Sequence, residues 1–366
     1  MFLAGDVMTG RGIDQILPHP GAPELHEPWM RDARGYVTLA ERKNGPIPRP
    51  VQFDYVWGEA LAVWRERKPD VRIVNLETSI TVSDEFWPAK GIHYRMHPRN
   101  VPCLTAAGLD CCVLANNHVM DWGREGLAET LTALHDSGLA TAGAGTNLED
   151  AARPARLPIG NAGDVLVFGF ADLSSGVPQE WRAGAESGGV NLLPNLSAKS
   201  VERAVRTIRR SSGESPLLVI ASIHWGGNWG YNVLPEQRIF AERLVDEAGV
   251  DIVHGHSSHH PIGIERYHGR TILYGCGDFL NDYEGIHGHE EFRPGLALMY
   301  FLDIADDAGR TQQLNIVPMR VRQMRLLHAG AAESDWLAAK LDEVSRPFET
   351  RVDKTNVGLS VHSARQ

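Results

Sequence analysis

Short apolar runs alternate with amphipathic segments along most of the chain. The runs that are typical of buried strands are residues 2–4, 71–76, 110–115, 165–170, 217–223, 250–253 and 271–274. The segments whose apolar residues recur with the helical repeat are 56–68, 123–137, 198–210 and 235–247. Strands that alternate with helices predict an α/β core.

Two long stretches interrupt this alternation. Residues 16–55 hold many prolines and charges, with one helix expected near 29–41, and residues 83–100 are aromatic and irregular before a short helix at 98–107. Long irregular insertions in a compact domain are usually functional, so we expect both to wall a site. A strand pair at 296–303 and 313–322 precedes a final helix at 335–346. We therefore predict a single catalytic domain over 1–366, with insertions at 16–55 and 83–100 and a C-terminal strand and helix extension at 310–366.

Polar side chains follow the predicted strands. Asp6, Glu77, Asn117, His224 and His256 each lie one to three residues beyond an apolar run. Open α/β sheets bind ligands at the carboxyl ends of their strands, so these five side chains are expected to meet at one crevice. The run that ends at residue 253 also releases a cluster of histidines, namely His254, His256, His259 and His260.

This set of side chains predicts a metal site. Asp6, Glu77, Asn117, His224, His256 and His259 offer carboxylate, amide and imidazole ligands. Such a mixture suits a hard or borderline divalent cation, and Ca, Mn, Mg, Fe and Zn all remain open. Each residue has a structural alternative: a turn cap, a surface carboxylate, an Asx turn or a core histidine. Their shared position at strand ends favours the metal.

His118 and Asp121 form a second candidate feature. A carboxylate three residues after a histidine can fix its tautomer, so that the pair acts as a general acid or base. Alternatively, Asp121 caps the helix predicted to begin at residue 123. Asp278 and Asp282 follow another strand and are expected to orient histidines of the site.

Four further residues are candidates for substrate binding. Arg11 offers a bidentate guanidinium for a carboxylate or phosphate, with a structural ion pair as the alternative. Trp225 and Trp229 either line an apolar pocket or pack in the core, and His260 completes the set.

Composition and charge exclude several classes of protein. The formal net charge of −10 argues against a nucleic-acid surface. No apolar run approaches the ~20 residues that cross a bilayer, and no signal peptide is recognisable, so we expect a cytoplasmic protein without membrane contacts. The four cysteines lack metal-binding spacing and fit reduced, buried thiols; Cys276 has no evident base partner for nucleophilic chemistry.

Five motifs resemble the CapA family, the poly-γ-glutamate capsule-synthesis proteins of calcineurin-like metallophosphoesterase fold. In chain order, they are Gly-Asp6-Val-Met-Thr-Gly-Arg11, Asn75-Leu-Glu77, Asn116-Asn117-His118-Val-Met-Asp121, His224-Trp-Gly and Gly255-His256-Ser-Ser-His259-His-Pro. The resemblance implies a four-layer α/β/β/α sandwich with the site at the strand ends. It also implies metal ligands at Asp6, Glu77, Asn117, His224, His256 and His259, and an acid/base histidine at His118.

One departure and a second resemblance shape the predicted reaction. Metallophosphoesterases of this fold carry a histidine at the position of Met8, and a thioether is a poor ligand for hard cations, so one of two metal sites is expected to be weak or absent. The Gly-His-Ser-Ser-His-His loop also resembles CapA-like lasso-peptide epimerases. Inversion at Cα needs a base and an acid on opposite faces, and the pairs His118 with Asp121 and His259 with Asp278 or Asp6 would supply them.

We therefore expect a metal-dependent enzyme that acts on a peptide, with Cα epimerisation of a ribosomal precursor peptide as the favoured reaction. The alternatives are a CapA-type metallophosphoesterase or amide hydrolase, and an accessory protein of poly-γ-glutamate synthesis. Nothing in the sequence sets the oligomeric state.

Overall fold

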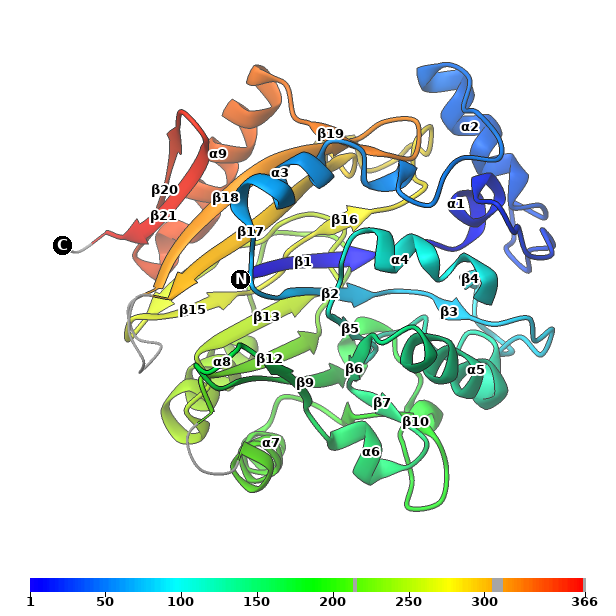
Figure 1. The fold of residues 1–366 in the computed structure, drawn as a ribbon. Helices are drawn as coiled ribbons and strands as arrows, with labels where there is room; N and C mark the ends of the chain where they lie inside the picture. The colour runs from blue at the N-terminus through cyan, green and yellow to red at the C-terminus, as the bar shows by residue number, and fades with distance from the viewer. Residues whose placement is uncertain (213–215, 305–311, 365–366) are drawn as a thin grey trace.

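The larger of two main sheets carries the N-terminal strand at its centre (Figure 1). The computed structural model describes residues 1–212, 216–304 and 312–364. Within these residues, eight strands of this sheet follow in the order β20 (Thr350–Thr355), β21 (Gly358–Ser363), β18 (Gln312–Val321), β17 (Leu296–Ile304), β1 (Phe2–Val7), β2 (Arg72–Leu76), β5 (Cys111–Val113) and β6 (Ala140–Ala142). Two more strands join it: β16 (Asp278–Leu280) pairs with β1, and β19 (Leu326–His328) pairs with β18.

The second main sheet contains the histidine-bearing strands. Its order is β11 (Leu192–Leu193), β9 (Asp164–Asp172), β12 (Leu218–His224), β13 (Ile252–His256), β15 (Arg270–Leu273) and β14 (Ile264–Tyr267), and β8 (Ala155–Pro158) pairs with β9. Two small sheets pair β10 (Gly189–Val190) with β7 (Ala144–Gly145), and β3 (Ser79–Ile80) with β4 (Arg95–Met96).

Helices connect and cover the sheets. Over the described residues, the α-helices are α1 (Arg11–Ile16), α2 (Arg34–Asn44), α3 (Ala60–Arg67), α4 (Pro102–Ala106), α5 (Gly123–Asp136), α6 (Leu148–Ala152), α7 (Ala198–Ser212), α8 (Pro235–Ala248) and α9 (Ala331–Ser345). Short 3-10 helices lie at Tyr55–Trp57, Pro98–Asn100, Leu173–Ser175, Gln179–Trp181, Glu290–Phe292 and Arg346–Phe348. Each of the described helices is too short or too polar to span a bilayer.

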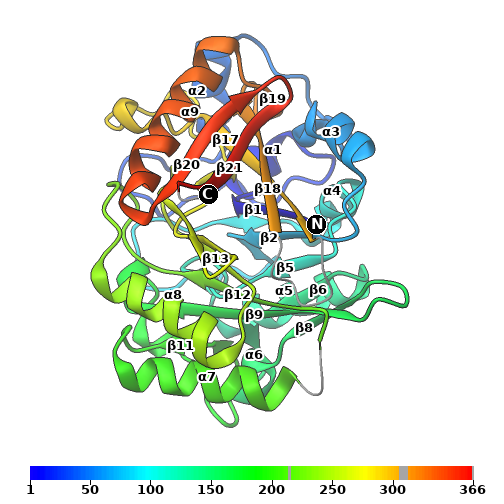
Figure 2. The same ribbon diagram turned by 90° about the vertical axis from the view of Figure 1, so that its left-hand side faces the viewer.

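The two main sheets pack against one another, and each has helices on its other face. Along β12, Leu218 and Ile220 join the core cluster shared with the larger sheet, whereas Val219 and Ile223 join the cluster that includes α7 and α8. This alternation follows from the two-residue period of a strand. Both faces of β12 are buried, as a parallel strand covered on two sides requires. In Figures 1 and 2, α7 and α8 lie at the bottom of the molecule, beneath β9, β12 and β13.

The mixed α/β fold confirms the predicted α/β core, while several boundaries differ. The helix expected at 29–41 is α2, which begins later, at Arg34. The helix expected at 98–107 is a 3-10 turn followed by the five residues of α4. The first strand continues to Val7, so Asp6 lies inside it rather than beyond it. His224 and His256 are likewise the last residues of their strands.

The C-terminal part of the chain extends the larger sheet. A strand and a helix were expected over 310–366, and β18 and α9 correspond to them; residues 310, 311, 365 and 366 lie outside the described residues. The sequence interpretation missed the hairpin formed by β20 and β21, because apolar and polar residues alternate in these strands and form no apolar run. Packing of α9 on β20 buries Leu337 and Leu341, which stabilises that edge.

Candidate metal centre

Three carboxylates meet at the end of the larger sheet. Asp6 of β1 lies opposite Asp278 of β16 in parallel register, and opposite Asn75 of β2 on its other side. Glu77 directly follows β2, so its carboxylate reaches the same end of the sheet. One oxygen atom each of Asp6, Glu77 and Asp278 lies within 4.8 Å of the others, and all three side chains are buried.

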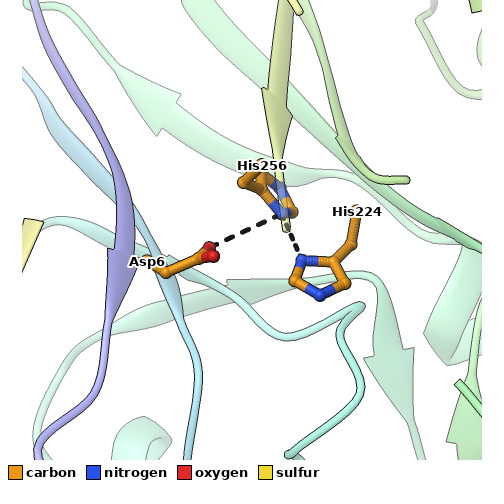
Figure 3. Close-up of side chains that lie close together, drawn as sticks. All are labelled: Asp6, His224 and His256. Atoms are coloured by element: carbon orange, nitrogen blue, oxygen red, sulfur yellow. Dashed lines mark hydrogen bonds and ion pairs between the residues drawn. The ribbon is translucent and has the colours of Figure 1, made fainter. Parts of the chain in front are cut away.

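Two imidazoles meet them from the second sheet. His224 and His256 end neighbouring parallel strands in register, and their Nδ1 atoms are 2.8 Å apart (Figure 3). Together with Asp6 they form a second group of donor atoms within 4.8 Å of one another. Asp6 therefore belongs to both groups, at the junction of the two sheets.

Burial makes these carboxylates difficult to ionise without a cation. Loss of solvent, and then the neighbouring Asp278, raise the pKa of Asp6 to about 7. Loss of solvent and the charge of Asp6 raise the pKa of Glu77 well above its usual range. Burial lowers the pKa of both His224 and His256, which leaves neutral rings with lone pairs. Converging carboxylate oxygens and neutral imidazole nitrogens are the donor set that a divalent cation takes, so the residues fit a bound metal.

Neighbouring groups hold Asp6 in place. Asn75 donates from Nδ2 to Asp6 Oδ1 over 2.7 Å, and the backbone N–H of Ser257 lies 3.3 Å from Oδ2. Ser257 has a φ of 102°, a conformation that non-glycine residues rarely adopt. Such strain is common at functional sites, and here it accompanies an N–H directed at the shared carboxylate. At Gly255, a Cβ would lie 2.4 Å from the Tyr274 carbonyl oxygen, so only glycine fits beside β15.

Two predicted ligands make contacts of a different kind. Asn117 Oδ1 lies 3.0 Å from His224 Nε2 and accepts a hydrogen bond from it in the amide orientation seen. His259 Nδ1 lies 3.0 Å from Asp278 Oδ1. Burial acts to lower the pKa of His259, but the carboxylates of Asp278 and Asp6 together outweigh it and raise that pKa. Asp278, expected to orient histidines and to form an acid/base pair with His259, also belongs to the all-carboxylate group. Its carboxylate is a candidate oxygen donor near the first motif, which has Met8 instead of histidine.

His118 and Asp121 form a buried pair beside the carboxylates. His118 Nδ1 is 2.6 Å from Asp121 Oδ2, and His118 Nε2 faces Glu77 Oε1 at 4.0 Å. Asp121 does not cap α5, because that helix begins after Trp122 without a side-chain cap; it instead accepts from the backbone N–H of Tyr94 over 2.6 Å. The capping interpretation is therefore wrong.

Lys90 completes this arrangement from the 83–100 insertion. Its ammonium forms an ion pair with Asp121 and lies 3.0 Å from His118 Nδ1. Burial lowers the pKa of Lys90, whereas burial and Lys90 together lower the pKa of His118 well below its ordinary value. A neutral His118 whose Nδ1–H is directed at Asp121 presents a lone pair at Nε2 toward the carboxylates.

A large cavity opens beside this centre. Its volume is about 630 Å³, and His259, Tyr94 and Tyr283 form its boundary with the metal centre. Tyr94 stacks on His118 with ring centres 3.7 Å apart, and its hydroxyl is 2.7 Å from that of Tyr283. Both insertions contribute to the wall, including Tyr36 from the first and Ile92 from the second.

The four candidate substrate-binding residues differ in whether they line the cavity. Trp229 lines the cavity, where it stacks on His289 at 3.8 Å. Trp225 is instead a core residue: its indole donates to the Tyr274 carbonyl oxygen and packs on Phe240, which corrects the expectation of a pocket wall.

Arg11 and His260 both contact neighbouring side chains of the protein. Arg11 touches the cavity, but its guanidinium is buried and pairs with Asp282 and Glu27, as in the ion-pair alternative. Asp282 therefore binds this arginine and not a histidine. His260 is buried and, among the described residues, is not part of the cavity lining; its ring centre lies 4.5 Å from that of Phe292.

The sequence interpretation missed two contributors to the site. Lys90 comes from an irregular insertion, where no periodicity indicates which side chains turn inward. Tyr94, in the same insertion, belongs to the aromatic stretch that was expected to wall the site, and it lines the cavity. Ser222, inside β12, bonds to two histidines and has no sequence signal at all. Cys276, by contrast, is buried, and loss of solvent raises the pKa of its thiol well above the ordinary value, which argues against a nucleophile.

Comparisons with known proteins identify the family of the chain. Residues 1–283 match the family described as "Bacterial capsule synthesis protein PGA_cap". A protein of Mycobacterium tuberculosis (strain H37Rv), named a probable polyglutamine synthesis accessory protein, is 49% identical over 353 residues, which are 96% of this chain and 92% of the relative. The capsule biosynthesis protein CapA of Bacillus anthracis is 25% identical over 88% of this chain and 67% of its own length. The PGA biosynthesis protein CapA of Bacillus subtilis is 27% identical over 76% and 62%, respectively.

Proposed function

The chain belongs to the bacterial capsule synthesis protein family, and from this premise we propose that it is a metal-dependent hydrolase that acts on a glutamate-based polymer or peptide. The proposal rests on the position of Asp6 at the junction of the sheets, where its carboxylate belongs to both groups of donor atoms. A carboxylate shared between two cation sites would hold two metal ions side by side. In two-metal hydrolases such a pair of ions stabilises both the attacking and the leaving oxygen.

The proposed cation sites differ in their ligands. Asp6, His224 and His256 suit Mn, Fe or Zn, whereas Asp6, Glu77 and Asp278 offer only oxygen and suit Mg, Ca or Mn. A bound divalent cation would supply positive charge that polarises a carbonyl or phosphoryl oxygen and acidifies water. In this proposal Asn117 would orient His224 and His259 would orient Asp278, through the hydrogen bonds that join each pair.

His118 is the proposed proton acceptor. Asp121 fixes its Nδ1–H, so the lone pair at Nε2 faces the carboxylates, and the depressed pKa keeps the ring neutral. A neutral imidazole in this position takes a proton from a water molecule or an attacking group. Tyr94 stacks on the ring and keeps it from rotating away.

The cavity supports an acidic, extended substrate. Its solvent-exposed cations, Lys43, Arg293 and Arg322, outnumber its exposed carboxylate, Glu290. The aromatic wall, formed by Trp229 and Tyr283, would pack against the aliphatic part of the substrate.

The fold arrangement proposed for this family is also supported. One core cluster lies between the two main sheets, and two others lie between each sheet and its helices. We propose that this corresponds to the four-layer α/β/β/α sandwich of calcineurin-like enzymes.

The test is a polymer-length assay. The chain is incubated with Mn²⁺ and poly-γ-glutamate, and new amino termini are counted by mass spectrometry. Release of shorter chains that the His118→Ala variant does not produce supports the hydrolase. A variant as active as the wild type in restoring polymer synthesis in cells would instead favour a non-catalytic accessory role.

A second candidate is Cα epimerisation of a peptide. Two histidine–carboxylate pairs, His118 with Asp121 and His259 with Asp278, adjoin one centre, as acid and base on opposite faces of a stereocentre require. Incorporation of one deuterium at Cα from D₂O without cleavage would favour this reaction over hydrolysis.

A further inference from the structure

A buried hydrogen-bonded chain connects the two sheets behind the candidate metal centre. His254 Nε2 lies 2.8 Å from the Ala4 carbonyl oxygen of β1, and His254 Nδ1 lies 2.9 Å from Ser222 Oγ. Ser222 Oγ in turn lies 2.9 Å from His256 Nε2. Ser222 and both histidines are fully buried, at 0% exposure, so solvent does not compete for these bonds. We propose that Ser222 and His254 are positioning residues that fix the tautomer of His256, so that its Nδ1 lone pair is available to a cation.

The direction of each hydrogen bond follows from the carbonyl at one end. A carbonyl oxygen only accepts, so His254 Nε2 carries the hydrogen that it donates to Ala4. The second nitrogen of His254 is then an acceptor, because a neutral ring has one N–H, and among the described residues the recorded contacts of this buried ring are to Ala4 and Ser222 and include no carboxylate. Ser222 therefore donates its only hydrogen to His254 Nδ1.

The remaining step assigns His256. Since the Ser222 hydrogen is already used, Oγ accepts from the next group, and His256 Nε2 must be the donor. A neutral His256 with hydrogen on Nε2 has a bare lone pair on Nδ1. This atom lies 4.0 Å from Asp6 Oδ1 and 2.8 Å from His224 Nδ1.

A matching contact acts on His224. Asn117 Oδ1 accepts from His224 Nε2, which leaves a lone pair on His224 Nδ1 as well. Two lone pairs 2.8 Å apart repel unless a cation or a proton lies beside both. Hydrogen bonds at the far nitrogens of both rings therefore prepare the pair to bind a cation, as outer partners of metal-binding histidines do.

The first experiment reads the tautomer in the metal-free wild-type chain. Nitrogen-15 chemical shifts of labelled histidine, assigned with a His256→Gln variant, separate protonated from bare ring nitrogens. We expect His256 to carry hydrogen on Nε2 and not on Nδ1. Hydrogen on Nδ1 would overturn the proposal, and this measurement needs neither metal nor activity.

The second experiment measures Mn²⁺ affinity by calorimetry. We expect Ser222→Ala to weaken binding by about 10- to 100-fold, as loss of an outer partner typically does, because His256 is then free to take the other tautomer. Ser222→Thr keeps the hydroxyl and should stay within about threefold of the wild type. The matched control is Ser345→Ala, which removes an equally buried hydroxyl bonded to the Ile264 backbone N–H.

The outcomes separate this inference from the proposed function on which it rests. A Ser222→Ala variant that binds Mn²⁺ as the wild type does overturns the positioning role, and so does equal weakening in all three variants. A wild-type chain that binds no divalent cation defeats the metal centre itself, while the tautomer measurement still decides the hydrogen-bond direction.

Discussion

The ammonium nitrogen of Lys90 lies 3.0 Å from His118 Nδ1, and the same ring nitrogen lies 2.6 Å from Asp121 Oδ2. Lys90 comes from the 83–100 insertion, whereas His118 and Asp121 follow β5. The insertion thus places a positive charge behind the histidine of the candidate centre. That charge opposes protonation of the ring, which suits a proton acceptor.

Replacement of Lys90 by Met should raise the pKa of His118. Burial still lowers that pKa, but the second cause, the cation of Lys90, is gone. If His118 acts as the base, the acidic limb of the pH–rate profile should move to higher pH. Lys199→Met, at an exposed position of α7, is the control and should leave the profile unchanged. An unshifted profile in the Lys90 variant would contradict this role.

Removal of metal should lower thermal stability. A ligand at 100 times its dissociation constant stabilises the folded state by about 2.7 kcal/mol, so excess Mn²⁺ should raise Tm by a few degrees, and a chelator should reverse the shift. Asp6→Asn should abolish the shift, since both donor groups use this carboxylate. Asp172→Asn changes another buried strand-end carboxylate, outside both groups, and should retain it. Differential scanning calorimetry measures both.

Arg11→Ala should destabilise the fold by about 3–5 kcal/mol, because it leaves the buried carboxylates of Asp282 and Glu27 without their cation. Arg34→Ala removes an exposed pair with Asp32 and should leave the free energy of unfolding nearly unchanged, because solvent screens this pair. Urea unfolding gives both values. Similar costs for the two variants would argue that the Arg11 cluster is not structural.

The two tryptophans near the site should respond differently to alanine substitution. Trp225→Ala should lower the free energy of unfolding by about 3–5 kcal/mol, because it opens a cavity in the core. Trp229→Ala should mainly weaken binding of a poly-γ-glutamate fragment, since this ring lines the large cavity. Urea unfolding and calorimetric titration separate the effects, and the opposite pattern would refute the assigned positions.

Asp342 should make a stability contribution that depends on pH. Burial acts to raise its pKa, but hydrogen bonds from Arg351, the Val352 backbone N–H and Arg346 outweigh it and lower the pKa to about 2. A folded-state pKa below the unfolded value of about 3.9 means that the contribution is full above that value and is lost as pH falls toward 2. Asp342→Asn should therefore cost about 2 kcal/mol at pH 7 and little near pH 2.

Urea unfolding of wild type and variant across this pH range provides the measurement for Asp342. Asp335→Asn, which removes an exposed pair with Lys354, is the control and should cost less than about 1 kcal/mol at any pH. A cost that is independent of pH would contradict the ionised network.

Much of the candidate site could be predicted because its residues are tied to strand ends. The carboxyl end of a buried strand is recognisable from an apolar run followed by polar residues, and parallel strands align those ends. Asp6 and Glu77 come together in this way, as do His224 and His256 in the other sheet. The local rule fails for Asp121, whose partners lie in an insertion rather than in the helix that follows it.

The sequence by itself determined the alternation of strands and helices, the family and the residue types that converge at the candidate site, because these depend on residue periodicity and on motifs that are local in the chain. Only the tertiary structure decided that Arg11 is neutralised by Asp282, that Lys90 lies behind His118 and that Ser222 connects two histidines. These contacts join residues 28 to 271 positions apart, and packing of the sheets and insertions selects each partner. No periodicity encodes such a choice, because it depends on which buried polar atoms are left facing one another once the layers have packed.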